Sequence, residues 1–251
     1  MIKINNFLGQ NQNLKVLEQK GIFTIIEHQQ DLSVSPGEAT GKYFMSQMNC
    51  RPRQVLISLQ NNAIRLKPGA MQYMTGNVTQ ETGVTGVGDL FGKAVRSRMT
   101  GDAPIKPLYK GTGIVMCEPT YKHLLIENVT EWGSMVCDDG MFVCCDDEVK
   151  DTAVMRNNFS SAIAGGEGLF NLGLVGNGYA VLQSPVPREE LYEIVLDNDC
   201  VKIDGNNAVC WSGSLQFTVE RSGKSLIGSA ASGEGLVNVY RGTGKILMAP
   251  L

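Results

Sequence analysis

Hydrophobic and polar residues alternate with a period of two along many short stretches of the chain. In residues 55–60 the apolar positions Val55, Ile57 and Leu59 recur at every second residue, and Met71 and Tyr73 repeat the pattern shortly afterwards. This period is that of a strand with one buried face. Because glycine, proline and asparagine interrupt the pattern every 8–12 residues, the chain is expected to fold as an all-β sandwich or barrel.

Three dipeptides that end in glycine separate apolar runs and predict chain reversals. They are Pro68-Gly69, Asp139-Gly140 and Asp204-Gly205. Glycine adopts positive φ without a steric penalty, so these sites predict hairpins centred on Gly69, Gly140 and Gly205. Signals for helix are few. Pro187 followed by acidic residues predicts at most one helical turn over residues 187–191.

An internal repeat organises the sequence. Residues 92–119 match residues 223–250 without a gap, at an offset of 131, with seven identities in 28 positions. Composition alone would give roughly two identities. A third copy lies between these two, because Gly166–Asn171 matches Gly233–Asn238. The period is therefore about 65 residues, half of the offset of 131.

Each copy contains a Gly-x-Gly motif, which we interpret as a turn, followed by an apolar strand that ends at a proline. The expected division is one body with an N-terminal β lead (residues 1–50) and three repeats (51–120, 121–186 and 187–251) in a pseudo-threefold arrangement. The motif glycines are Gly111 and Gly113, Gly176 and Gly178, and Gly242 and Gly244, and the strands end at Pro119, Pro185 and Pro250.

Composition excludes several classes of protein. The chain has 251 residues, 43% of them hydrophobic and 19% charged, with 29 glycines and a net charge of −3. These values exclude intrinsic disorder and a coiled coil, and the acidic balance argues against a long nucleic-acid-binding surface. The N-terminus lacks the pattern of a secretory signal, and no apolar run is long enough to span a bilayer. We therefore expect a cytoplasmic protein in which the seven cysteines, none in C-x-x-C spacing, act as small hydrophobic residues.

No motif in the sequence specifies a reaction. Gly223-Lys224-Ser225 lacks the first glycine of a phosphate-binding loop, since Thr218 occupies that position. His28 and His123 are the only histidines, too few and too far apart for a histidine metal site, and no G-x-S-x-G motif occurs. We expect no catalytic residue, no cofactor and no metal. An enzyme with a pocket assembled from distant residues remains an alternative.

A local basic segment is the one candidate for contacts with an anion. It contains Lys93, Arg96, Arg98, Lys106 and Lys110, and Arg51 and Arg53 form a second small group. Such residues either contact phosphate groups or form the solvated side of a long loop, and we favour the loop. The acidic groups Asp138-Asp139 and 146–148 could bind Ca²⁺, but they lack the EF-hand spacing. The first pair coincides with the predicted hairpin at Gly140, so we favour a solvated turn.

Several motifs resemble one known family. Leu66–Met71, Gly166–Asn171, Gly176-x-Gly178 and Leu182–Ser184 are similar to the "altered inheritance of mitochondria" family of TRAP-like proteins, named after the trp RNA-binding attenuation protein. The resemblance covers nearly the whole chain and is weakest over residues 1–50. It implies three tandem TRAP-like β-sandwich units, a short variant of the double-stranded β-helix.

The resemblance carries less information about activity. It implies no catalytic residues, and the mitochondrial relatives are connected with the organisation of the inner membrane and respiratory complexes. Attenuation proteins bind RNA through a basic set repeated around a ring. Lys110 and Arg241 align in two copies, but Val175 occupies the middle copy, so RNA binding is not implied.

The leading hypothesis is a non-enzymatic β scaffold or binding module that associates with itself, as a homo-oligomer, or with another protein. Binding of RNA or another anionic polymer through residues 93–110 is one alternative. An enzyme with an unrecognised pocket is the other.

Overall fold

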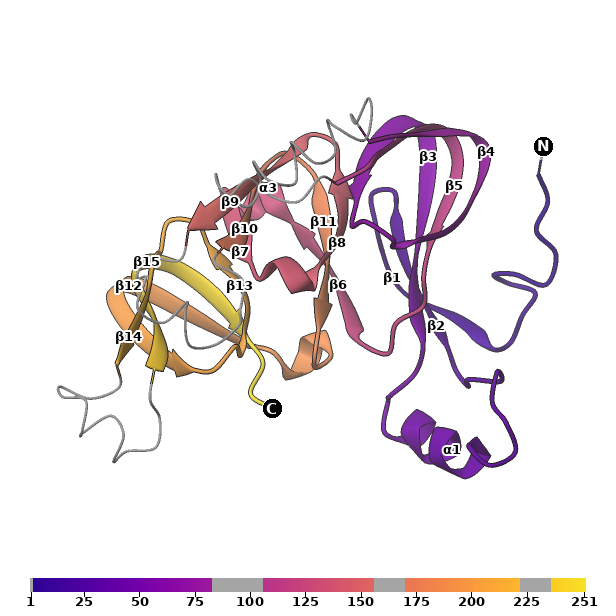
Figure 1. Ribbon diagram of the computed structural model, residues 1–251, viewed down its shortest axis with the longest axis horizontal. Coiled ribbons are helices and arrows are strands. Elements are labelled where there is room, and N and C mark those ends of the chain that lie inside the picture. Colours follow the sequence, from indigo (N-terminus) through magenta and orange to yellow (C-terminus); the bar gives the residue numbers. More distant parts are fainter. Residues whose placement is uncertain (1, 83–105, 156–169, 222–235) are drawn as a thin grey trace, which may run out of the picture.

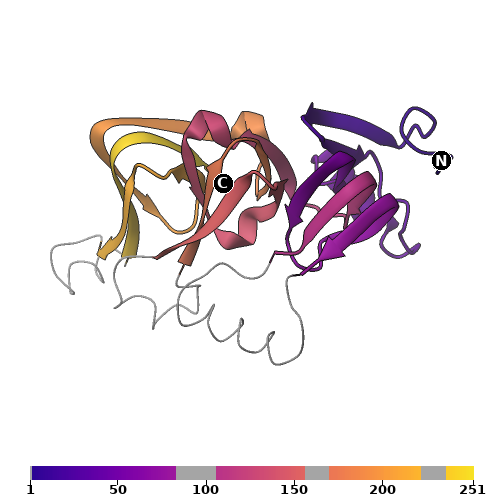
Figure 2. The same cartoon turned by 90° about the horizontal axis from the view of Figure 1, so that it is seen from above.

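The computed structural model describes residues 2–82, 106–155, 170–221 and 236–251, and strands dominate them (Figure 1). The expected all-β class is confirmed. The described strands form an eight-stranded and a seven-stranded sheet, both antiparallel and strongly curled in the view from above (Figure 2). The first sheet contains β1 (Leu14–Lys20), β2 (Phe23–His28), β3 (Arg53–Leu66), β4 (Met71–Glu81), β5 (Leu108–Cys117), β6 (His123–Asn128), β8 (Phe142–Asp146) and β11 (Tyr179–Ser184). The second contains β7 (Ser134–Cys137), β9 (Val149–Met155), β10 (Phe170–Gly176), β12 (Tyr192–Asp204), β13 (Ala208–Ser212), β14 (Gln216–Arg221) and β15 (Leu236–Met248).

Helices are short in the described ranges. A 3₁₀ turn at Arg188–Glu190 confirms the single helical turn expected after Pro187, and another occupies Asp139–Met141. The α-helices are α1 (Ala39–Gln47) and α3 (Val129–Trp132). Helix α1 lies within the expected N-terminal β lead of residues 1–50, together with β1 and β2. Its side chains are mostly exposed, so it lacks the apolar stripe by which a helix is recognised in a sequence.

The predicted alternation in β3 is confirmed. Val55, Ile57 and Leu59 are buried together in the core of the first sheet. Leu56, on the opposite face of the strand, is also buried, because it packs with Met116 and with N-terminal residues. This end of the molecule therefore has apolar packing on both faces of β3.

The three glycine dipeptides end strands but do not form hairpins. Gly69 and Gly205 adopt φ of 76° and 63°, as a tight turn requires. However, β5 lies between β3 and β4, and β15 lies between β12 and β13. At Gly140 the flanking strands β7 and β8 even belong to different sheets. The turn residues thus mark where one strand ends and the next begins, whereas the strand that returns later in the chain determines the pairing.

Two of the three Gly-x-Gly motifs are not turns. Gly111 and Gly113 lie within β5, and Gly242 and Gly244 lie within β15, while Gly176-Asn177-Gly178 joins β10 to β11. In β5 the reason for glycine is close contact with β4. A Cβ atom on Gly111 would lie 2.0 Å from the carbonyl oxygen of Asn77.

The same irregularities recur along the chain. One residue is skipped in the pairing of β4 with β5, of β8 with β11 and of β13 with β15. A second shared detail is a threonine hydroxyl that accepts a hydrogen bond from a backbone N–H in the facing strand. The Asn61 N–H donates to Thr112 over 3.1 Å, and the Asn198 N–H donates to Thr243 over 3.0 Å.

Five of the seven cysteines are buried in the core, as predicted, and their burial raises the pKa of Cys144, Cys145 and Cys210. The other two are Cys50, which is half-buried, and Cys200, whose side chain is exposed on β12. Within the ranges that the structure describes, no helix has the length and hydropathy needed to cross a bilayer.

Candidate functional site

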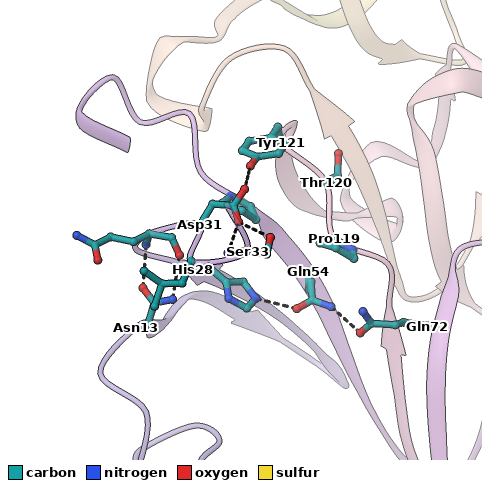
Figure 3. A pocket seen from close by; sticks show the side chains of 12 residues that line it. Asn13, His28, Asp31, Ser33, Gln54, Gln72, Pro119, Thr120 and Tyr121 are labelled. Carbon is teal, nitrogen blue, oxygen red and sulfur yellow. Dashed lines mark hydrogen bonds between the residues drawn. The ribbon is translucent and has the colours of Figure 1, made fainter. Parts of the chain in front are cut away.

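A pocket of about 390 Å³ lies where β1 begins and β2 ends, beside β3, β4 and the segment that follows β5 (Figure 3). Most of the residues that line it have polar side chains, which come from distant parts of the chain. They include Asn13, His28, Gln30, Asp31, Ser33, Gln54, Gln72 and Tyr121.

A row of hydrogen bonds crosses one side of the pocket (Figure 3). The ring nitrogen Nε2 of His28 is 2.9 Å from Oε1 of Gln54. The amide nitrogen of Gln54 donates to Oε1 of Gln72 and to the carbonyl oxygen of Cys117, each over 2.9 Å. Gln54 is buried, so this row fixes its amide at the pocket wall.

A second network centres on Asp31. Its carboxylate accepts hydrogen bonds from Ser33, over 2.6 Å, and from the Tyr121 hydroxyl, and it pairs with Lys42 of α1 over 2.9 Å. These hydrogen bonds hold the pKa of Asp31 well below its usual range. Hydrogen bonds to Tyr121 and Asp31 raise the pKa of Lys42, and burial raises that of Tyr121. At neutral pH all three groups therefore keep a fixed protonation state, in contrast to a general acid or base.

A buried ion pair lies beside the pocket. Arg53 Nη2 contacts Glu27 Oε2 over 2.6 Å, and the two side chains are 1% and 4% exposed. Arg51 bonds the other oxygen of Glu27 over 3.1 Å, and Arg53 also donates to Asn49, which follows α1. The basic pair Arg51 and Arg53 is therefore a structural clamp that ties the α1 segment to β2, which corrects its interpretation as an anion contact or solvated group.

His123, at the start of β6, is half-buried. Burial, followed by the positive charge of Arg53, lowers the pKa of His123 to about 4, while Glu189 and Glu27 act in the opposite direction. In the unfolded chain a histidine titrates near 6.5. Between about pH 6.5 and 4 the unfolded state binds more protons, so stability must decrease as the pH falls through that window.

This shift gives a testable prediction. The melting temperature of the wild-type protein is expected to fall as the pH decreases from about 6.5 to 4, and His123→Gln is expected to reduce that fall. The control is His28→Gln, which removes the other histidine and leaves His123 in place. Thermal unfolding followed by circular dichroism across this range measures the effect. Equal pH dependence in His123→Gln and the wild type would contradict it.

The structure separates the predicted basic residues. Lys106 is buried, pairs with Asp151 over 3.2 Å and lies over the Phe142 ring, whereas Lys110 is exposed and pairs with Glu81 over 2.6 Å. Lys106 is therefore not available at a surface. Lys93, Arg96, Arg98 and the Gly223–Ser225 motif lie outside the described residues.

The acidic cluster at residues 146–148 is only partly solvated. Asp147 and Glu148 form a turn between β8 and β9, and Glu148 is exposed, whereas Asp146 is the last residue of β8. Asp146 accepts a hydrogen bond from the Tyr179 N–H over 2.7 Å, and burial raises its pKa. Asp147 pairs with Arg65 over 2.8 Å. Among the residues that the structure describes, no group of three or more His, Cys, Asp or Glu side chains is arranged to hold a metal ion.

Two exposed sheet edges form a second candidate region. Within the described chain, β4 pairs with β5 alone and β12 pairs with β15 alone. Apolar side chains are exposed on both: Met74 of β4 is 40% exposed, and Val195 of β12 is 69% exposed. The edge of β6 is protected by a side chain, because Lys20 of β1 donates a hydrogen bond to the Ile126 carbonyl oxygen over 3.0 Å. A long edge without such protection is a template for pairing with another strand.

Comparisons with known proteins agree with the expected relationship. The chain is 28% identical to an uncharacterised protein of Streptococcus pyogenes serotype M6 over 196 residues, which cover 75% of this chain and 77% of that protein. A crystal structure of a Streptococcus pyogenes protein superposes with a TM-score of 0.63 at 26% identity, over 81% of this chain and 90% of that one. The model of the family described as mitochondrial biogenesis AIM24 matches residues 46–251. The chain therefore belongs to the mitochondrial biogenesis AIM24 family.

Proposed function

We propose that this protein is a non-enzymatic β scaffold that associates with itself. The observation that carries the proposal is the pair of long edge strands, β4 and β12, which have one partner each within the described chain. Both carry exposed apolar side chains. Pairing between copies would satisfy the free backbone groups and bury these side chains.

The proposed scaffold consists of three tandem TRAP-like units, over residues 51–120, 121–186 and 187–251, after the lead of residues 1–50. Each unit contains one residue that is skipped in strand pairing, at a matching place in the unit, and this supports the division. The two threonine hydroxyls that accept from the facing strand, Thr112 and Thr243, support it as well. A unit of this size buries little apolar surface alone, so its stability depends on its neighbours.

The state of the polar pocket favours a scaffold over an enzyme. Asp31, Lys42 and Tyr121 bond to one another, and the pKa of each is shifted away from neutrality. Gln54 and Gln72 are likewise bonded together. These contacts hold residues 28–54 against the segment that follows β5, which is a structural role.

The ion pairs favour a scaffold over a binder of anionic polymers. A phosphate contact needs a cation free to leave its partner. Of the described members of the basic segment, Lys106 is buried against Asp151, and Lys110 already contacts Glu81.

The proposal predicts concentration-dependent association. Multi-angle light scattering is expected to give a mass above the 27.2 kDa of one chain, increasing with concentration. Met74→Lys places a charge on the free edge of β4 and is expected to lower that mass, whereas Gln80→Lys, farther along the same strand, is the matched control. A mass of one chain at all concentrations would contradict self-association.

A further inference from the structure

We infer that copies of this chain join head to tail, with β12 of one copy paired antiparallel to β4 of the next and Lys202 opposite Met74. This inference rests on the proposed self-association and specifies its surface and register. It follows from two junctions, each a pairing of two strands within the chain, that share one pattern. A third junction with this pattern, between β12 and β4, is absent from the described chain.

The first junction joins β3 to β8 in antiparallel pairing. Arg65 lies opposite Cys145, between the pairs Ile64–Asp146 and Leu66–Cys144. The N–H of Asp147 donates to the Ala63 carbonyl oxygen over 3.2 Å, which fixes which backbone groups face the partner strand.

The second junction joins β7 to β13 in the same way. Val136 lies opposite Trp211, between the pairs Met135–Ser212 and Cys137–Cys210. The N–H of Gly213 donates to the Ser134 carbonyl oxygen over 2.9 Å. Relative to the central pair, this donor and acceptor occupy the same positions as Asp147 and Ala63 do in the first junction.

The returning strands define which residue of β12 corresponds to Arg65. Ile64 lies opposite Tyr109, two residues before Gly111, and Met135 lies opposite Leu174, two residues before Gly176. In β12, Val201 lies opposite Tyr240, two residues before Gly242. The residue after Val201 is Lys202, which therefore corresponds to Arg65 and Val136.

The same reference defines the partner position in β4. Cys145 pairs with Ala180, two residues after Gly178, and Trp211 pairs with Ile246, two residues after Gly244. In β4, Met74 pairs with Val115, two residues after Gly113. Met74, Cys145 and Trp211 each lie two residues after the residue that is skipped in the pairing of their strand. Met74 thus corresponds to Cys145 and Trp211.

The burial of the side chains differs between the two junctions within the chain and the proposed junction between copies. Cys145 and Trp211 are buried, whereas Met74 is 40% exposed and Lys202 is exposed. Figure 1 shows β4 and β12 at opposite ends of the molecule, so one chain cannot bring its own two edges together. A second copy supplies the matching edge. Because the two edges differ, the contact is heterologous and builds a ring or a filament.

Disulfide trapping between two different variants tests the register. One protein carries Met74→Cys and the other Lys202→Cys, both with Cys50→Ser and Cys200→Ser, so that the other cysteines are the buried ones. The Cα atoms of directly opposed residues in a hydrogen-bonded pair are about 5.5 Å apart, within the range that a disulfide spans. Mixing and mild oxidation are expected to give a cross-linked dimer on a non-reducing gel, which neither variant gives alone.

Gln80→Cys mixed with Lys202→Cys is the matched control, because Gln80 is exposed six residues along β4, roughly 20 Å away. Equal cross-linking in the control, or a dimer from Met74→Cys alone, would overturn the head-to-tail register. Absence of the cross-link in a protein that light scattering shows to be oligomeric would overturn this inference and leave the scaffold proposal intact. A monomer in both measurements would overturn both.

Discussion

Gly111→Ala is expected to destabilise the protein by more than about 3 kcal/mol. Gly111 adopts φ of 131°, a conformation that L side chains rarely adopt, and its Cβ would lie 2.0 Å from the Asn77 carbonyl oxygen. The methyl group therefore adds a collision with the β4 backbone to the conformational strain. Unfolding in denaturant measures the loss, and a stability close to that of the wild type would show that β4 and β5 separate at little cost.

Gly242→Ala provides the matched control for this collision. Gly242 also has positive φ, of 118°, but the nearest atom to its added Cβ is 3.8 Å away. The substitution should therefore cost about 1–3 kcal/mol from backbone strain alone. The difference between the two variants isolates the steric contribution at Gly111, and equal losses would contradict it.

Glu27→Gln is expected to cost about 3–5 kcal/mol, because it leaves the buried guanidinium of Arg53 without its counter-charge. Both side chains are almost completely buried, and the Arg53–Glu27 contact is 2.6 Å. Arg51→Ala should cost about 1 kcal/mol or less, since its side chain reaches solvent. Chemical denaturation of both variants measures the two losses.

The double variant Glu27→Met with Arg53→Met separates the charge effect from lost packing. Replacing both members of a buried ion pair by apolar residues is often close to neutral. The double variant should therefore recover much of the stability lost in Glu27→Gln. If it is less stable than Glu27→Gln, the pair stabilises the fold by its own attraction and geometry, and the explanation by an unpaired charge is wrong.

Local sequence patterns predict the strands well, but they do not predict which strands pair with each other. The alternation at Val55, Ile57 and Leu59 identifies β3, and Gly69 and Gly205 mark true turns with positive φ. The pairing of β3 with β5 instead of β4 depends on a strand that returns more than forty residues later, beyond 83–105. The motif at Gly111 predicts a turn, although the structure has a strand there, because positive φ serves both a turn and the close approach of two strands.

The polar pocket was missed for a related reason. Its residues extend from Asn13 to Tyr121, and their chemistry depends on tertiary contacts that no spacing in the sequence records. Arg53 is the clearest example. In the sequence it is one of two nearby arginines, typical of a solvated group, whereas the fold buries it against Glu27. The sequence pattern also does not reveal helix α1, which is tied to this pair. Side-chain contacts hold the helix, and it has no apolar stripe that would mark it in the sequence.

Hydrogen–deuterium exchange of the backbone amides, measured as a function of protein concentration, tests self-association at the sheet edges most directly. Backbone groups that pair between copies exchange slowly. The account predicts that peptides covering Met71–Thr75 and Cys200–Asp204 become protected together as concentration rises, while residues 14–20 of β1 do not change. Rapid exchange in both peptides at every concentration would contradict it.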